Sequence, residues 1–147
     1  MHPETLFIGS SQISRWPLPK TATVKHAKFS HELFSARLPK HASRIVVYCG
    51  SNDILHGLDP VDNVLKFVEA LCQRYPDADI TILAILLSPR ATKFAAEIRR
   101  ANDRIRRGLP SDVNYVNMNR TLVHPKYYCE DGLHLNAIGY EVWERAI

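Results

Sequence analysis

Three short polar segments contain the residue types that acyl transfer to a serine requires. They are Gly9-Ser10-Ser11, Gly50-Ser51-Asn52-Asp53 and Asp131-Gly132-Leu133-His134. A serine hydroxyl is a weak nucleophile at neutral pH and needs a neighbouring base, which a histidine can supply. A carboxylate can hold the imidazole in the right tautomer, and an amide can bind the negative oxygen that forms during attack. Together the segments would supply a nucleophile, a base, an orienting carboxylate and an oxyanion donor.

Each segment also has a plainer interpretation. Ser11 could cap a helix that begins after the first strand. Asn52 and Asp53 could form a turn or a helix cap at the end of a strand, and the Asp131 segment is typical of a turn. His134 could be an ordinary, partly buried histidine. The chemical interpretation therefore depends on whether the fold brings the three segments together.

The elements that would position these segments alternate between strands and helices. Short apolar runs predict strands at 5–9, 22–29, 44–49, 79–87 and 113–118. Apolar residues at helical spacing predict helices between Pro60 and Pro76, over 93–107, and from Asn136 onward. In the last helix we expect Ile138, Val142 and Trp143 to point inward.

This alternation predicts a doubly wound parallel sheet, that is, a three-layer α/β/α sandwich. For a five-stranded parallel sheet we expect the flavodoxin-like order 2-1-3-4-5, with the topological switch between strands 1 and 3. Ligands of such sheets bind at the carboxyl ends of the strands beside the switch. Ser11 and Asn52 follow strands 1 and 3, so they should emerge at one crevice, and the loop containing His134 could return to the same edge.

Length and composition are those of one globular domain spanning 1–147. The chain is 46% hydrophobic and 23% charged, which is ordinary for a folded protein. No apolar run approaches the ~18 residues of a membrane span, and the first residues do not resemble an export signal. The three cysteines are an odd number without metal-like spacing, which favours reduced thiols and a cytoplasmic location.

Other chemistries lack their motifs in this sequence. It contains no GxSxG, P-loop or GxGxxG, which argues against an α/β-hydrolase proper, an NTPase and a dinucleotide enzyme. His56 and His124 do not have metal-ligand spacing, so no metal site is predicted. The net charge of +4 comes largely from 93–107, where the arginines fall on the outer face of an amphipathic helix. We therefore predict a solvated face; nucleic-acid binding through this helix is the alternative, and it would depend steeply on salt.

Three stretches resemble conserved blocks of the SGNH (GDSL-type) hydrolases. "FIGSSQISRW", "YCGSNDI" and "DGLHLNAIGYEVW" are similar to the first, third and fifth blocks, in the same order and within the same α/β pattern. The resemblance covers nearly the whole chain. It implies that Ser11 is the nucleophile and donates its N–H to the oxyanion, that Asn52 donates its side-chain amide, that His134 is the base, and that Asp131 orients it.

The resemblance also implies the type of reaction. Members of this family are esterases, lipases, thioesterases and carbohydrate deacetylases that use no metal or organic cofactor. We therefore expect a small-molecule acyl ester as substrate and an acyl-enzyme on Ser11 that water hydrolyses.

Two departures from the family pattern concern catalysis. The usual Gly-Asp-Ser reads Gly9-Ser10-Ser11, and no glycine occurs between Gly9 and Gly50 to provide the second-block N–H. Ala27 or a neighbour stands in its place, although only glycine takes positive φ without strain. Because the loss of one oxyanion donor costs about 10²–10³ in kcat, we expect a slow enzyme or a donor in another geometry. The alternative is a hydrolase-like binding or interaction module.

Overall fold

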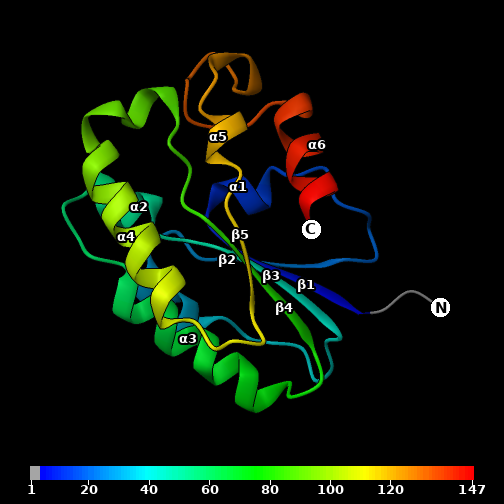
Figure 1. The fold of residues 1–147 in the computed structure, drawn as a ribbon. Coiled ribbons are helices and arrows are strands. Elements are labelled where there is room, and N and C mark those ends of the chain that lie inside the picture. Colours follow the sequence, from blue (N-terminus) through cyan, green and yellow to red (C-terminus); the bar gives the residue numbers. More distant parts are fainter. Residues whose placement is uncertain (1–3) are drawn as a thin grey trace.

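The computed structural model describes residues 4–147, which contain a five-stranded parallel sheet (Figure 1). The strands are β1 (Thr5–Gly9), β2 (Thr23–His26), β3 (Arg44–Tyr48), β4 (Asp79–Leu83) and β5 (Asn114–Val116). They lie in the order β2-β1-β3-β4-β5, and every neighbouring pair is parallel. The predicted fold class and strand order are therefore confirmed.

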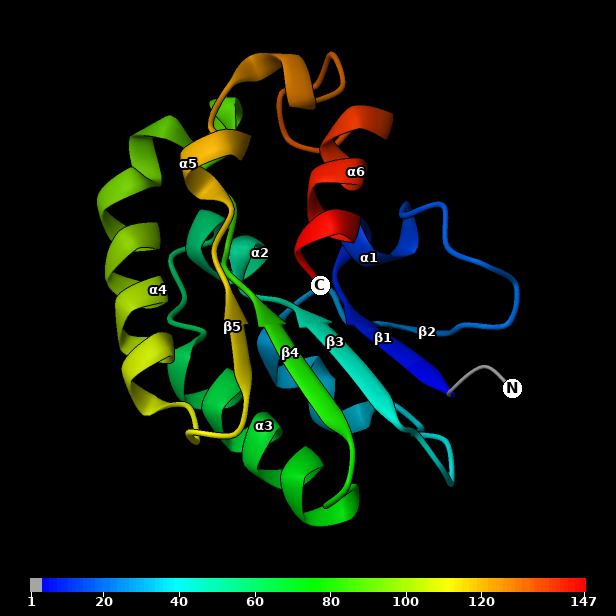
Figure 2. The same ribbon diagram turned by 45° about the vertical axis from the view of Figure 1, so that its right-hand side comes forward.

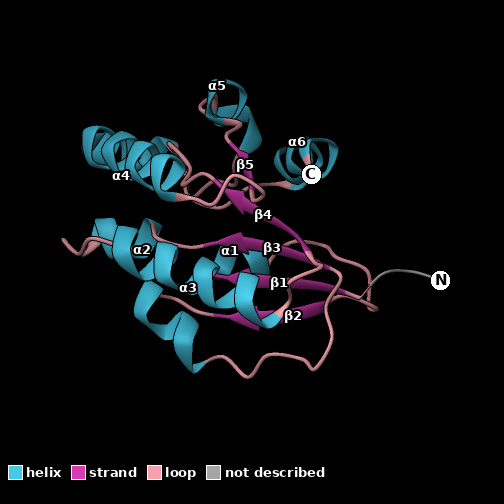
Figure 3. Cartoon of the chain, turned by 60° about the horizontal axis from the view of Figure 1, so that its bottom comes forward, coloured by secondary structure: helices cyan, strands magenta, loops and turns pink. Residues whose placement is uncertain are grey.

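Helices connect the strands and cover both faces of the sheet (Figures 2 and 3). The α-helices are α1 (Ser11–Ser14), α2 (Ser51–Leu55), α3 (Val61–Arg74), α4 (Ala95–Gly108), α5 (Asn119–Leu122) and α6 (Ala137–Ala146). Three 3₁₀ segments add η1 (Ser30–Ser35), η2 (Pro89–Phe94) and η3 (Pro125–Tyr127). The helix predicted at 93–107 thus begins as the 3₁₀ segment η2 and continues as α4.

Alternate side chains of the central strands point to opposite faces of the sheet, as strand geometry requires. One face packs against α3, α4 and η1, and its strand residues are Leu6, Ile8, Ile45, Val47, Ile80 and Ile82. The other face packs against α1, α5 and α6, and its strand residues are Phe7, Val46, Tyr48 and Leu83. The all-apolar runs in the sequence therefore reflect strands that are covered on both sides.

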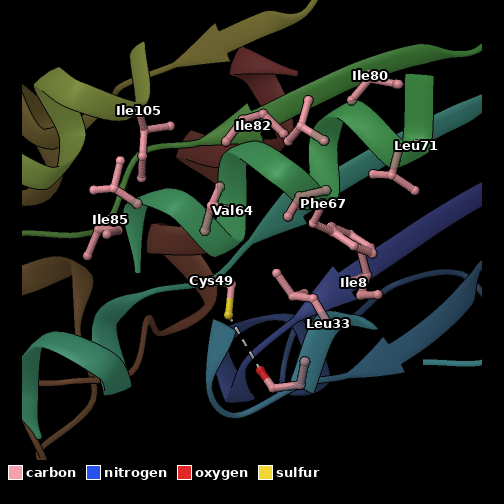
Figure 4. Close-up of a cluster of buried hydrophobic side chains, with 14 of the residues drawn as sticks. Ile8, Leu33, Cys49, Val64, Phe67, Leu71, Ile80, Ile82, Ile85 and Ile105 are labelled. Carbon is pink, nitrogen blue, oxygen red and sulfur yellow. Dashed lines mark hydrogen bonds between the residues drawn. The ribbon is translucent and has the colours of Figure 1, made fainter. Parts of the chain in front are cut away.

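Figure 4 shows the layer between the sheet and α3. Ile8, Ile80 and Ile82 of the strands face Val64, Phe67 and Leu71 of the helix. Cys49, at the end of β3, is 4% exposed, and its thiol lies 3.8 Å from the Ala27 carbonyl oxygen. Cys49 is therefore a small residue of the buried core.

The strand predicted at 79–87 ends earlier, at Leu83. Residues 84–87 are apolar and mostly buried, but their backbone leaves the sheet after Ala84, whose N–H still donates to Val116. Ile85 then pairs through both its N–H and C=O with the side chain of Asn102, and the Leu87 N–H donates to Asn119. Two asparagine side chains thus replace a neighbouring strand, which composition alone does not reveal.

Helix α6 begins as predicted, because the Asn136 side chain accepts a hydrogen bond from the Gly139 N–H at 3.0 Å. Trp143 is 1% exposed, but Ile138 is 45% exposed, so the inward position predicted for Ile138 is wrong. The buried face of the helix runs through Gly139, Tyr140 and Trp143. Ile138 lies one residue, or about 100°, away from that face.

Helix α4 has the predicted two faces. Ile98, Ala101 and Ile105 are buried against the sheet, whereas Arg104 pairs with Asp59 at 2.8 Å on the exposed side. Among residues 4–147, no helix is both long enough and apolar enough to cross a bilayer.

Candidate active site

Ser11 stands at the carboxyl end of β1, as the first residue of α1. Its Oγ lies 2.8 Å from Nε2 of His134. The helix-cap interpretation fails, because the cap position belongs to Ser10, whose side chain makes no capping hydrogen bond. The hydroxyl of Ser11 is instead directed at a histidine 123 positions away in the sequence.

Gly9 explains why the strand ends where it does. Its φ is +156°, and a Cβ at this position would lie 1.8 Å from the carbonyl oxygen of Tyr48. The next N–H, that of Ser10, donates to the same oxygen at 3.1 Å. Only a residue without a side chain lets β1 turn this close to β3 and deliver Ser11 to the edge of the sheet.

Asp131 holds His134 from the other side. Its Oδ2 lies 2.6 Å from His134 Nδ1, and its Oδ1 accepts the N–H groups of Leu133 and His134 at 2.9 and 3.0 Å. The hydrogen bond from the imidazole, followed by those from the two backbone N–H groups, holds the pKa of Asp131 well below its usual range. The carboxylate is therefore ionised wherever the imidazole works as a base.

Asn52 lies in α2, directly after β3. Its Nδ2 donates to the carbonyl oxygen of Lys28 at 3.1 Å, and the second hydrogen of the amide remains for another acceptor. The next residue, Asp53, is 2% exposed and accepts the N–H and hydroxyl of Ser30. These contacts attach α2 to the segment after β2 and fix the position of Asn52.

Ala27, the predicted second-block donor, does not have a free N–H. That N–H donates to the Gly9 carbonyl at 2.7 Å, as part of the contact between β2 and β1. The N–H groups of Phe29 and Ser30 are bonded to the carboxylates of Glu32 and Asp53. Of the donor predicted at Ala27 or a neighbour, Ala27 itself therefore has no free N–H in this structure.

Ser11, Asn52 and His134 line one small, enclosed pocket. Leu55, Leu86, Ala91 and Ile98 contribute apolar side chains to its lining. The pocket leaves about 20 Å³ for the centre of a water-sized sphere, and a site needs roughly 10–15 Å³ by that measure to hold one water. The pocket therefore holds about one water-sized group.

The arrangement has the parts for proton transfer and oxyanion binding. His134 can take the proton of Ser11 while Asp131 stabilises the resulting imidazolium. The N–H of Ser11 lies in the first turn of α1, where backbone donors have no partner within the helix.

Within residues 4–147 no group of three His, Cys, Asp or Glu side chains is arranged to hold a metal ion.

Sequence reasoning missed Gln12. The residue is 4% exposed, and its side chain bonds to the backbone of Leu133 and Leu135, on both sides of His134. A single glutamine next to a serine carries no sequence signal for such a contact, because its partners lie more than 120 positions away.

The sequence matches the model of the GDSL-like lipase/acylhydrolase family over residues 19–142. The matched range includes Asn52, Asp131 and His134 and begins after Ser11. A search of curated proteins finds no match.

Solved structures share the whole fold. A provisionally named platelet activating factor from Streptococcus pneumonia superimposes with a TM-score of 0.81 and 22% identity, covering 99% of this chain and 82% of that one. An acetyl xylan esterase from Geobacillus stearothermophilus superimposes with a TM-score of 0.75 and 12% identity, covering 98% of this chain and 92% of that one. A family 3 carbohydrate esterase from Clostridium thermocellum superimposes with a TM-score of 0.72 and 14% identity, covering 98% of this chain and 94% of that one. At these identities the likeness establishes the fold.

Proposed function

Because the chain belongs to the GDSL-like lipase/acylhydrolase family, we propose that it is a serine esterase with Ser11 as its nucleophile. The observation that carries the proposal is the hydrogen-bonded series from Ser11 Oγ to His134 Nε2 and from His134 Nδ1 to Asp131. Ester hydrolysis is the general activity of the family, and the residue roles are the specific part of the proposal.

In the first half-reaction, Ser11 Oγ forms a bond with the ester carbonyl carbon as its proton passes to His134 Nε2. The carbonyl electron pair moves onto the oxygen, and the N–H of Ser11 and the second amide hydrogen of Asn52 bind that oxyanion. The intermediate then collapses: the bond to the alkoxide breaks, and the alcohol leaves with the proton from His134. The acyl group remains on Ser11 as an ester.

In the second half-reaction, water replaces the alcohol and the same steps run in reverse order. His134 takes a proton from the water as its oxygen attacks the acyl carbon, and the same two donors bind the oxyanion. Breaking the bond to Ser11 Oγ releases the carboxylic acid and returns the proton to the serine. Asp131 remains a carboxylate throughout.

The small pocket beside Ser11 favours an acetyl ester. The leaving alcohol must face His134, which protonates it, and solvent, so the acyl group occupies the apolar recess formed by Leu55, Ala91 and Ile98. The pocket has room for about one water-sized group, which matches the methyl of an acetyl group. Two of the structural neighbours are esterases, named as an acetyl xylan esterase and a carbohydrate esterase, which agrees with an acetylated carbohydrate as substrate.

The proposed site has two oxyanion donors, the N–H of Ser11 and the amide of Asn52, and this number affects the expected rate. An enzyme that lacks one donor turns over about 10²–10³ times more slowly than its fully equipped counterpart. We therefore expect slow turnover even for esters with good leaving groups.

The test combines covalent labelling with ester hydrolysis. A fluorophosphonate should label the wild type and the variant Ser14→Ala, in which an exposed serine of the same helix is replaced. The variant Ser11→Ala should not be labelled and should lose at least about 10³-fold in kcat. Among p-nitrophenyl esters, acetate should be cleaved fastest, and the rate should fall for butyrate and octanoate.

Hydrolysis by Ser11→Ala at the wild-type rate would refute the assignment of the nucleophile. If the wild type is neither labelled nor active, the chain is the binding module that the sequence left as the alternative. An octanoate ester cleaved as fast as the acetate would refute the assignment of the acyl pocket.

A further inference from the structure

We propose that Gln12 is a positioning residue that sets the distance between the His134 imidazole and the Ser11 hydroxyl. The inference rests on the proposed function in one respect, that Ser11 and His134 are nucleophile and base. The structural observation does not depend on that function: the buried carboxamide of Gln12, on the helix that contains Ser11, hydrogen-bonds to the loop that contains His134.

The side chain of Gln12 makes two hydrogen bonds to the peptides that flank His134. Its Nε2 donates to the Leu133 carbonyl at 2.7 Å, and its Oε1 accepts the Leu135 N–H at 3.1 Å. Gln12 is 4% exposed and Leu135 is 2% exposed, so the bond between them is buried, and the bond to Leu133 is partly buried. Both ends of the carboxamide are satisfied by one short backbone segment.

The other hydrogen bonds of the Leu133–Leu135 backbone are local, and the neighbouring Gly132 carbonyl accepts the N–H of Arg90, in η2, at 3.0 Å. The N–H groups of Leu133 and His134 donate to Asp131, and the His134 carbonyl accepts the N–H of Cys129 at 2.8 Å. They give the loop its shape but do not fix its place relative to α1. Arg15 and Asp131 also join the two elements, but at 3.9 Å and with the arginine side chain 53% exposed such a pair contributes little.

Gln12 supplies the missing connection because it is the residue after Ser11. One helix turn therefore holds both the attacking hydroxyl and the anchor for the loop that presents the base. Tyr140, on α6 beyond the loop, donates its hydroxyl to the Gln12 carbonyl at 2.7 Å, so the anchor itself is held from the far side. The 2.8 Å contact between Ser11 and His134 follows from this arrangement.

Removal of the carboxamide should therefore move His134. The buried Leu135 N–H and the part-buried Leu133 carbonyl would both lose their partner, and the loop would shift to expose them to water. A displacement of about 1 Å in a reacting group can cost about 10²-fold in rate. Because Gln12 acts on the base and binds no part of the ester that the pocket selects, the loss should appear in kcat.

The experiment compares Gln12→Met, of similar length but without hydrogen-bonding groups, with Gln12→Glu, which keeps the acceptor for Leu135. We expect kcat for p-nitrophenyl acetate to fall about 10–100-fold in Gln12→Met, with KM within about threefold. In Gln12→Glu the loss should be at least as large, because the second carboxylate oxygen would face the Leu133 carbonyl, which needs a donor. The second-order rate of fluorophosphonate labelling should fall in parallel with kcat.

Two readouts do not depend on turnover. The ¹⁵N resonance of His134 Nε2 reports its hydrogen bond with Ser11, and Ser11→Ala supplies the value for the broken bond. In Gln12→Met this resonance should move toward the Ser11→Ala value, and the Leu135 amide should exchange faster with solvent. If the wild type hydrolyses no ester, the proposed function fails while these two measurements still test the positioning role.

Asn102 offers a matched control. It is 5% exposed, and its side chain makes the same pair of bonds to the N–H and C=O of Ile85, at 2.8 and 2.9 Å. Asn102→Leu should lose stability as Gln12→Met does but keep the wild-type Nε2 resonance. If Gln12→Met does not fold, Gln12→Glu carries the test. Wild-type kcat with an unmoved resonance in the folded Gln12 variant would overturn the proposal, as would an equal shift in Asn102→Leu.

Discussion

Replacing Asp131 by asparagine tests whether the carboxylate controls which nitrogen of His134 carries the proton. One carboxylate oxygen accepts the N–H groups of Leu133 and His134, and the other faces His134 Nδ1. In Asp131→Asn the amide oxygen must take the first position, because an NH₂ group there would face two donors. The NH₂ group is then forced toward Nδ1 and donates to it. The imidazole proton is left on Nε2, the atom that must accept the proton of Ser11.

The expected loss is about 10⁴-fold in kcat, the cost of holding a catalytic histidine in the wrong tautomer. At 1.36 kcal/mol for each factor of ten, this is about 5.4 kcal/mol of transition-state stabilisation. KM should change little, because Asp131 does not line the pocket beside Ser11. Initial rates with p-nitrophenyl acetate at neutral pH measure both quantities, and a thermal melt confirms that the variant is folded.

Asp59→Asn is the control for this experiment. Asp59 also accepts a backbone N–H, that of Val61 at 3.0 Å, and its pKa is lowered by that bond and by Arg104. It makes no hydrogen bond to Ser11, His134 or Asp131, so Asp59→Asn should keep the wild-type kcat. An Asp131→Asn variant that retains more than about a tenth of wild-type kcat would refute the tautomer argument.

Three further predictions concern the same framework. Gly9→Ala should lose at least about 4 kcal/mol in urea unfolding or fail to fold, because its Cβ would lie 1.8 Å from the Tyr48 carbonyl oxygen; near wild-type stability would contradict the proposed need for glycine. Asn52→Ala should lose about 10²-fold in kcat and remain folded, since only its exposed bond to the Lys28 carbonyl is removed, and unaltered kcat would remove Asn52 from the oxyanion site. The lowered pKa of Asp131 means that its stabilising contribution is present above the unfolded value of about 3.9 and is lost as pH falls further. The stability difference between wild type and Asp131→Asn, measured by urea unfolding, should therefore shrink on acidification, and a difference that grows would contradict the cause given.

The sheet could be predicted from the sequence because each apolar run is separated from the next by a clear helical pattern. Apolar runs separated by helical patterns permit few arrangements once every crossover is right-handed. The prediction was wrong where local composition stopped being informative. Residues 84–87 are as apolar as a strand, yet Asn102 and Asn119 take over their backbone hydrogen bonds. The inward position predicted for Ile138 was wrong because the buried face of α6 begins one residue later, at Gly139.

The residues of the candidate triad were within reach for a different reason. Asp131 and His134 share one short loop, and Ser11 follows a strand that ends at the topological switch, whereas the roles of the three residues were implied by the resemblance to the SGNH (GDSL-type) hydrolases. Gln12 was not within reach, because its partners are set by how a loop far along the chain folds back over α1. The use of the Ala27 N–H could not be predicted, because it depends on the register between β1 and β2, in which Gly9 pairs with His26 and accepts from the next residue.

The hydrogen bonds of the segment after β2 also affect the proposed oxyanion site. Its N–H groups at Ala27, Phe29 and Ser30 bond to Gly9, Glu32 and Asp53, so they hold the sheet edge, η1 and α2 together. Asp53 is adjacent to Asn52, and Asn52 bonds to the Lys28 carbonyl. The segment therefore stabilises the amide donor while its own donors at these three positions are used in packing. Under the proposed function, the oxyanion would therefore bind to Asn52 and to the N–H of Ser11, which agrees with the absence of a glycine between Gly9 and Gly50.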